Sequence, residues 1–254
     1  MYKSLKRITA ILSISLFCMF ATYSSIVSQQ TVPLAYPASD SNISEYYPAS
    51  FNKAIKKSRQ SAVQIVSIEP DSGSLSIFSG TYFETAGSYF VVTVLHGIAG
   101  ECAATKIIHQ DKVHDCIKYI TSDNMADYII IQVEEIESRV PIKIPQDIPN
   151  HQQWKRTYSL LNKLVYTGYP NTIGPLTIDG EVSGFAGTDY LYMMSYAWQG
   201  SSGSGVFDKN GKYIGYVVAI DVGQTEHGIQ ILQNVVLVVP SYKIDWIKAL
   251  TERE

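Results

Sequence analysis

Gly200-Ser201-Ser202-Gly203-Ser204-Gly205-Val206-Phe207 is the stretch from which the fold of this chain can be predicted. Its glycines let the backbone adopt conformations that residues with a side chain reach only at a cost. Such a loop can hold one serine hydroxyl outward while neighbouring backbone N–H groups point to a common position. Acyl transfer needs both features, but most Gly/Ser clusters between strands are turns or flexible loops. The loop alone therefore leaves a catalytic and a structural interpretation open.

One catalytic pattern is excluded. The nucleophile elbow of α/β-hydrolases reads G-x-S-x-G and opens a helix. Around Ser202 the second glycine would stand at position 204, which is a serine, and the apolar run that follows, Tyr213 to Ile220, is typical of a strand.

Two upstream stretches favour catalysis. His96 follows the β-branched apolar run 91–95, and Asp127 precedes another such run, 128–131. Asp123 is an alternative to Asp127 as the acidic residue of the site, but no strand follows it directly. The order His, Asp, Ser along the chain is that of the chymotrypsin type. A packed histidine at a strand end and an aspartate in a turn are the structural alternatives.

With these residues the sequence resembles the trypsin-like serine peptidases, most of all the bacterial HtrA-like and V8-like branches. Their nucleophile loop reads G-[NS]-S-G-[SG]-P-[VL], and the pattern around 79–83 and the Gly-Tyr-Pro at 168–170 also resemble them. The resemblance covers roughly residues 56–250. It implies an all-β fold of two packed six-stranded antiparallel β-barrels with a short N-terminal and a C-terminal helix. Strand spacing alone predicts only a sandwich or a barrel.

The resemblance also implies roles and a function, that of a serine endopeptidase. Ser202 is expected to be the nucleophile, His96 the general base and then the general acid, and Asp127 the residue that orients the histidine. The N–H groups of Gly200 and Ser202 are expected to form the oxyanion hole, with no metal or cofactor. Two alternatives remain: an inactive homologue that binds peptides in the same cleft, and an esterase with the same triad.

Departures from the family pattern concern details of the site. Gly205 stands where proline is usual, which is expected to loosen the loop slightly, and Leu95 stands where a smaller or polar residue is usual. Val217 lies near the place where relatives keep a serine or, in glutamyl peptidases, a histidine. The presence of valine in place of that histidine argues against specificity for glutamate.

The substrate pocket is assigned only by position along the chain. Tyr196, Val218 and Ala219 are the candidates for its walls, and they indicate an apolar or small P1 residue. His227 lies in a later loop, expected over 221–228, where a surface position is favoured over one in the pocket.

The amino-acid composition limits the classes of protein to which the chain can belong. The chain has 254 residues, 46% of them hydrophobic and 17% charged, with 18 tyrosines. This suits one domain, or two closely packed halves, built of many short strands. A net charge of -3 gives no support for nucleic-acid binding, so the expected partner is a protein or peptide substrate.

The N-terminus predicts export. Lys3, Lys6 and Arg7 precede an apolar stretch from about Ile8 to Val27, typical of a signal peptide or a single membrane anchor. Residues 1–28 are therefore expected to direct the remainder outside the cytoplasm, either membrane-anchored or, if cleaved, secreted or periplasmic. A polar linker is expected over 29–55, and no PDZ-like segment or activation cleavage is expected.

The peptidase domain is expected over 56–250, with its first barrel at about 60–140 and its second at about 155–240. A short basic helix is expected over 51–60, and a terminal helix over 241–250 with Ser241 as its N-cap.

Cys102 and Cys116 flank a predicted hairpin of 106–109 with 112–118. In an exported protein this pair favours a disulfide over two separate thiols. His109, His114 and Asp115 fit no common metal-ligand spacing and are expected in an exposed polar hairpin.

Overall fold

The computed structural model describes residues 50–251 apart from 111, 146–147, 151, 188–189 and 226–227, and it leaves the side chains of 219–231 and 233 undescribed. The predicted signal or anchor segment, and the linker up to residue 49, lie outside the described residues. Residues 43–254 fall in one compact unit. In the described part, no helix combines the length and the apolar character needed to cross a bilayer.

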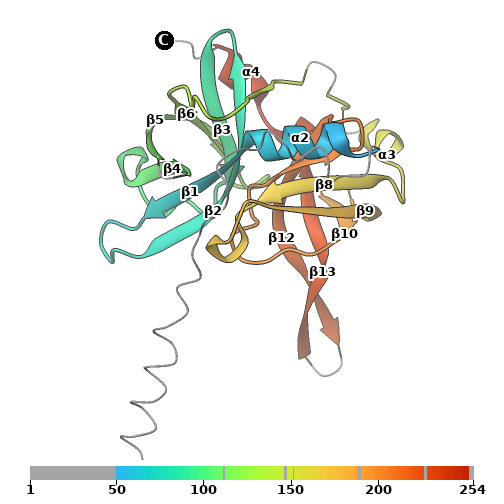
Figure 1. The fold of residues 1–254 in the computed structure, drawn as a ribbon. Coiled ribbons are helices and arrows are strands. Elements are labelled where there is room, and N and C mark those ends of the chain that lie inside the picture. Colours follow the sequence, from blue (N-terminus) through green and yellow to red (C-terminus); the bar gives the residue numbers. More distant parts are fainter. Residues whose placement is uncertain are drawn as a thin grey trace, which may run out of the picture. The chain divides into compact units, whose positions relative to one another are not determined.

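The described part consists of two antiparallel β-barrels, as the resemblance predicts (Figure 1). In the first barrel, the order β1-β4-β5-β6-β3-β2 is closed by pairing of β1 with β2, and the short β7 adds to β2 in parallel. The second barrel closes in the order β10-β13-β12-β11-β8-β9. The first barrel comprises β1 (Ala62–Ile68), β2 (Leu75–Thr85), β3 (Ser88–Val94), β4 (Thr105–His109), β5 (Lys112–Asp123) and β6 (Tyr128–Val133), followed by β7 (Ile142–Lys143). The second comprises β8 (Lys163–Gly168), β9 (Leu176–Ala186), β10 (Tyr190–Met194), β11 (Gly205–Asp208), β12 (Tyr213–Thr225) and β13 (Gly228–Pro240).

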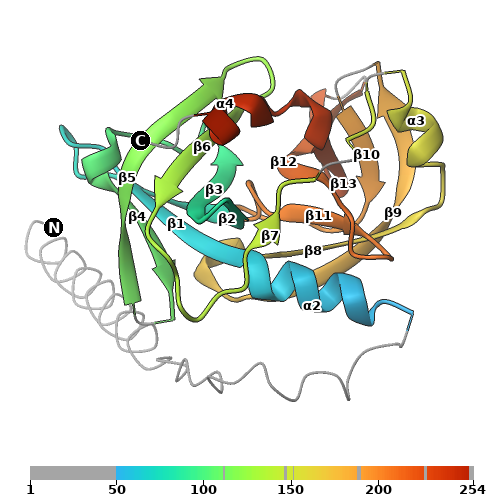
Figure 2. The same ribbon diagram turned by 90° about the horizontal axis from the view of Figure 1, so that it is seen from above.

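Short helices flank the barrels (Figure 2). They are α2 (Asn52–Ser61), α3 (Trp154–Thr157) and α4 (Trp246–Thr251), with 3₁₀ turns η2 (Cys102–Ala104), η3 (Pro170–Thr172) and η4 (Ser241–Lys243). Helix α2 joins the barrels, because it packs on strands of both and the Ser58 hydroxyl donates to Thr167 Oγ1 of β8 at 2.7 Å.

Two apolar clusters fill the molecule. One lies within the second barrel around the fully buried Trp154 and Tyr166. The other fills the first barrel and continues across the junction, where Phe83 packs edge-on against Tyr213 of β12 with ring centroids 5.0 Å apart. The barrels therefore share apolar packing, and the residues between them are held from both sides.

Two expectations about elements are wrong. The loop expected over 221–228 is a continued hairpin, because β12 runs to Thr225, which pairs with Gly228. The terminal helix does not begin at Ser241, which lies in the turn η4. Helix α4 begins at Trp246, and Asp245 Oδ1 accepts the Lys248 N–H at 3.3 Å.

Candidate active site

Two neighbouring strands bring the histidine and the aspartate to one point. Val94 at the end of β3 pairs with Tyr128 at the start of β6, so His96 in the following turn lies beside Asp127. His96 Nδ1 lies 2.5 Å from Asp127 Oδ2, and the His96 backbone N–H donates to Oδ1 at 2.8 Å. The carboxylate therefore fixes the ring orientation. The His96 side chain stays 51% exposed, which leaves it open to a substrate.

Asp123, the alternative to Asp127, has a structural role in the preceding turn. Asp123 Oδ1 accepts the backbone N–H groups of Met125 and Ala126, each at 2.7 Å, and so closes the turn that leads to Asp127. From the second barrel, the buried Tyr216 donates its hydroxyl to the Ala126 carbonyl at 2.5 Å. Burial raises the pKa of Tyr216 well above its usual value, so this donor keeps its proton. Tyr216 was not among the residues predicted for the site, although a tyrosine in an apolar strand indicates a buried hydroxyl that needs a partner.

Solvent access distinguishes the three serines of the glycine-rich loop. Ser201 is 1% exposed and Ser204 is fully buried, whereas Ser202 is partly exposed. Only Ser202 is therefore open to an incoming substrate.

The Ser202 hydroxyl donates to the carbonyl oxygen of Val218 in β12 at 2.8 Å. Among the described residues it makes no hydrogen bond with His96. The structure thus joins His96 to Asp127 and directs the Ser202 hydroxyl to β12.

The backbone around Ser202 offers free donors. Within the described part of the chain, no acceptor engages the N–H of Gly200 or of Ser202. The Gln199 carbonyl accepts the Asn171 N–H at 2.7 Å. Because N–H and C=O of a trans peptide point in opposite directions, the Gly200 N–H points away from Asn171. Two unpaired N–H groups beside a serine can stabilise a negatively charged oxygen.

Positive backbone dihedrals shape this loop. Gly200 has φ +95° and Gly203 has φ +87°. A Cβ at Gly203 would lie 1.9 Å from the Ser79 carbonyl oxygen and 2.4 Å from Thr93 Oγ1, both in the first barrel. Since Thr93 lies on β3, which leads to His96, this close approach brings the serine loop to the strand that carries the histidine.

The departures from the family pattern have structural explanations. A Cβ at Gly205 would lie 2.4 Å from Thr81 Oγ1, so contact with the first barrel excludes a larger residue there. Gly205 is buried and pairs with Tyr216 in β11–β12. Leu95 packs against the core of the first barrel, and Val217 is buried with its N–H bonded to the Ser204 carbonyl.

Of the predicted pocket residues, Val218 contacts Ser202, because its carbonyl accepts the Ser202 hydroxyl. Tyr196 is 59% exposed and stacks on Trp198 with ring centroids 6.1 Å apart, and its carbonyl accepts the Tyr166 hydroxyl. The backbone of Ala219 pairs with Leu237, but its side chain and all of His227 lie outside what the structure describes.

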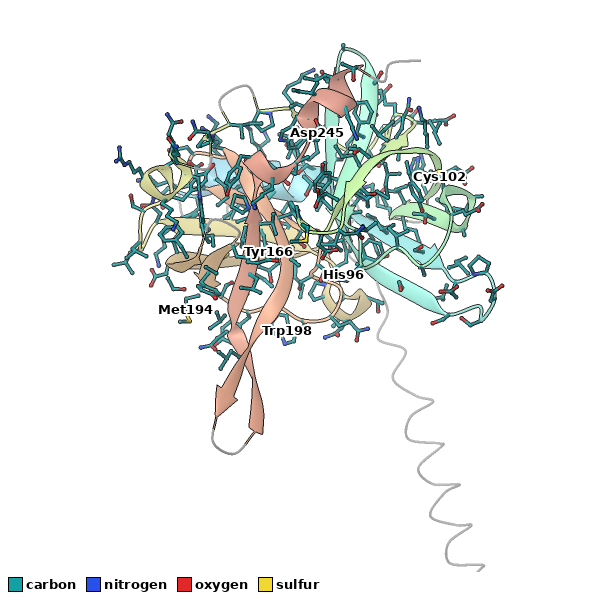
Figure 3. The ribbon with its side chains drawn as sticks, turned by 180° about the vertical axis from the view of Figure 1, so that it is seen from behind. His96, Cys102, Tyr166, Met194, Trp198 and Asp245 are labelled. Carbon is teal, nitrogen blue, oxygen red and sulfur yellow. A yellow bond between two sulfur atoms is a disulfide. The ribbon has the colours of Figure 1, made fainter. Side chains whose placement is uncertain are left out.

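The predicted hairpin and disulfide are present. β4 pairs with β5, and Cys102 is bonded to Cys116 with Cα atoms 5.3 Å apart (Figure 3). One expectation is wrong: His109 is only 5% exposed, because it lies on the same face of β4 as the buried Thr105 and Ile107. Asp115 pairs with Lys106 at 2.7 Å, which lowers the pKa of that carboxyl. Across the described ranges, no three histidine, cysteine or acidic side chains gather as a metal site would require.

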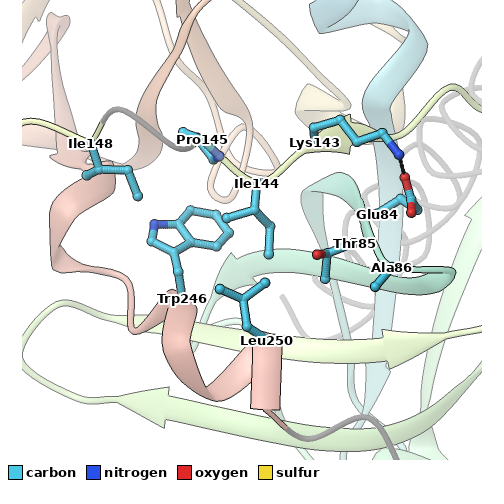
Figure 4. A pocket seen from close by; sticks show the side chains of 9 residues that line it. All are labelled: Glu84, Thr85, Ala86, Lys143, Ile144, Pro145, Ile148, Trp246 and Leu250. Atoms are coloured by element: carbon cyan, nitrogen blue, oxygen red, sulfur yellow. Dashed lines mark ion pairs between the residues drawn. The ribbon is translucent and has the colours of Figure 1, made fainter.

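A separate hollow lies between α4, β7 and the β2–β3 turn (Figure 4). Trp246, Leu250 and Ile144 give it apolar walls, and an ion pair between Glu84 and Lys143 lies at one end. It offers no nucleophile beside a base, so the chemistry of the candidate site belongs to the Ser202 region.

Comparisons with known proteins support the fold. No model of a known protein family matches the sequence, and no curated protein matches it. The serine endoprotease of Yersinia pestis is a similar solved structure, with 18% sequence identity and a TM-score of 0.57. The match covers 78% of this chain and 64% of the Yersinia chain, so this chain spans less than two thirds of that structure. The chain thus has the fold of the chymotrypsin-like serine proteases.

Proposed function

We propose that this protein is a serine endopeptidase that hydrolyses peptide bonds of proteins. The observation that carries the proposal is the hydrogen-bonded His96–Asp127 pair. The solvent-accessible Ser202, with two free backbone N–H groups in its loop, supports it. Each is a requirement of acyl transfer by an activated serine. The fold, shared with a serine endoprotease, adds support.

In the proposed mechanism Ser202 Oγ attacks the peptide carbonyl carbon while His96 Nε2 takes the hydroxyl proton. Asp127 keeps the proton on Nδ1 and stabilises the imidazolium. The carbonyl oxygen becomes negatively charged and accepts the N–H groups of Gly200 and Ser202. His96 then protonates the leaving amine, and water releases the acyl group by the same steps in reverse.

The resting position of the nucleophile adds one step. Ser202 donates to the Val218 carbonyl, so its hydroxyl must turn to His96 before attack. Catalytic hydrogen bonds in free enzymes often tighten only when substrate binds.

For specificity we propose that Tyr196, Val218 and Ala219 line the pocket and that it accepts an apolar or small P1 residue. The stacked, exposed Tyr196–Trp198 pair offers an apolar contact beside the serine loop. The positively charged start and apolar stretch of the first 28 residues support an exported protein, anchored or secreted.

The test is cleavage of an unstructured polypeptide by the full chain, with the new termini identified by mass spectrometry. The proposal predicts cuts after apolar or small residues, abolished by Ser202→Ala. A parallel ester substrate separates a peptidase from an esterase. Ester turnover without any peptide cleavage would contradict an endopeptidase.

A second candidate is an inactive homologue that binds peptides in the same place. The bond from Ser202 to Val218, in place of one to His96, favours it. This candidate predicts that Ser202→Ala leaves peptide affinity unchanged and that neither chain hydrolyses the bound peptide.

A further inference from the structure

Ser79 lies in the middle of β2, in the first barrel, and is fully buried. Within the described part of the chain it makes four hydrogen bonds outside the strand pairing, and three of them go to residues of the second barrel. The backbone N–H donates to the Ser202 carbonyl at 2.9 Å, and the hydroxyl donates to the Gly200 carbonyl at 2.6 Å. The hydroxyl also accepts the Tyr169 N–H at 2.9 Å, and the Ser79 carbonyl accepts the Thr93 hydroxyl at 2.6 Å.

These bonds fix the backbone on both sides of Gly200. The peptide group before it is held through the Gln199 carbonyl by Asn171, and the one after it through the Gly200 carbonyl by the Ser79 hydroxyl. Gly200 has φ +95°. Because glycine has no side chain to restrict its backbone, other contacts must hold this conformation. The direction of its N–H therefore depends on those two anchors.

The same hydroxyl also holds the neighbouring segment. Tyr169 leads into the turn that carries Asn171, so Ser79 also supports the Asn171 anchor indirectly. A Cβ at Gly168 would lie 2.8 Å from Ser79 Oγ, which shows how closely this segment packs on the hydroxyl. An apolar residue at 79 would leave the Gly200 carbonyl and the Tyr169 N–H without these partners in a buried place, which is costly.

We propose that Ser79 is a positioning residue that sets the Gly200 and Ser202 N–H groups for the negatively charged oxygen of the reaction. The inference rests on the proposed peptidase function and deepens it. It makes the oxyanion site a product of both barrels, because the donors come from the second barrel and their anchor from the first. Ser79 touches no reacting atom, and its effect passes through Gly200.

The test compares Ser79→Ala with Ser58→Ala in the full chain. Ser58 is a matched control, since it is also buried and its hydroxyl also bonds to the second barrel, from α2 to Thr167 of β8. We expect kcat of Ser79→Ala to fall at least about tenfold, but by no more than the loss of a whole oxyanion donor would cause. KM is expected to change by less than about threefold. Ser58→Ala is expected to keep kcat within about twofold, at a similar loss of stability.

A second readout isolates the oxyanion. The affinity of a peptide aldehyde, whose adduct carries a charged oxygen, should fall with kcat in Ser79→Ala, while that of an unreactive peptide should not. Equal kcat losses in both variants, or a loss confined to KM, would overturn the role of Ser79. If Ser79→Ala does not fold, Ser79→Cys, which keeps the size and a weak donor, is measured in its place and a wild-type kcat overturns the proposal.

A chain without any turnover would contradict the proposed function and not the role of Ser79. That role is then read from hydrogen exchange of the Gly200 and Ser202 amides. Faster exchange in Ser79→Ala than in Ser58→Ala supports it, and unchanged exchange overturns it.

Discussion

At the residue scale, the candidate site depends on how Asp127 and Asp123 divide their tasks. The sequence favoured Asp127 because an apolar strand follows it. That argument has a physical basis, since the antiparallel pairing of β3 with β6 places Asp127, just before β6, beside His96, just after β3. Asp123 has its carboxylate engaged by the turn N–H groups.

Asp127→Asn therefore has a defined expected effect. The amide keeps the size of the side chain but favours the wrong histidine tautomer, so kcat should fall by about 10⁴ with the fold intact. Asp123→Asn retains an oxygen for the turn N–H groups and should keep kcat within about threefold. Steady-state kinetics of both variants test this, and similar losses in the two would contradict the role of Asp127.

The contacts of Gly203 could not be predicted from sequence. Its spacing in the loop indicates only a turn, whereas the close approach to Ser79 and Thr93 depends on how the barrels meet. The same holds for Ser79 and Tyr216, whose partners lie far away along the chain. Their one signal in the sequence is a polar group within an apolar strand.

Gly203→Ala should consequently be severely destabilising. The Cβ meets backbone at 1.9 Å and φ +87° is strained for alanine, so the loss should exceed about 4 kcal/mol. Gly184→Ala is the control, because the added Cβ meets only the Tyr192 side chain, at 3.3 Å and 3.9 Å, and it should cost about 1 kcal/mol or less. Denaturant unfolding measures both, and equal stabilities would refute this packing at the junction.

At the scale of elements, strands were easier to predict than their ends. Alternating and β-branched runs indicated the strands, but β12 and β13 extend beyond the expected limits because Asp221 to Thr225, polar in part, continue to pair across the hairpin. The terminal helix shortens because the chain first makes the η4 turn, and Trp246 Nε1 donates to the Ser241 carbonyl at 2.9 Å. Such tertiary contacts are not visible in local sequence.

The disulfide joins η2 to β5 and closes a loop with a sequence separation of 14. Replacing both cysteines, Cys102→Ser with Cys116→Ser, should cost about 3 kcal/mol by the loop-entropy relation. Chemical denaturation under oxidising conditions measures the difference. A double variant as stable as the unsubstituted chain would show that the bond adds nothing to the β4–β5 region.

Buried tyrosines in the second barrel predict an alkaline transition. Desolvation raises the pKa of Tyr166 to about 12, and that of Tyr158 to about 12. Since the pKa of an unfolded tyrosine is about 10, the folded state keeps these protons to higher pH. The contribution of the two tyrosines to stability is fully present below pH about 10 and is lost as the pH rises through about 12. Unfolding free energies across this range, with tyrosinate absorbance, test this, and a flat profile would contradict it.

At the scale of the whole molecule, two barrels share a core that continues across their junction, and the candidate residues come from both: His96 and Asp127 from the first barrel and Ser202 from the second. Composition predicted only an all-β domain, and the two-barrel architecture came from the resemblance, whose motifs lie far apart in the sequence. The junction itself, with Ser79 and Tyr216 reaching across it, needed the three-dimensional structure. The spacing of His96, Asp127 and Ser202 carries no information about these contacts.

The central claim is that Ser202 is an activated nucleophile. The most direct measurement is reaction of the full chain with a fluorophosphonate, with the modified residue located by mass spectrometry, beside His96→Ala and the buried-serine variant Ser201→Ala. We predict a covalent adduct on Ser202 that His96→Ala abolishes, because the unassisted hydroxyl is a weak nucleophile. No adduct on the folded chain, or an adduct that persists in His96→Ala, would contradict it.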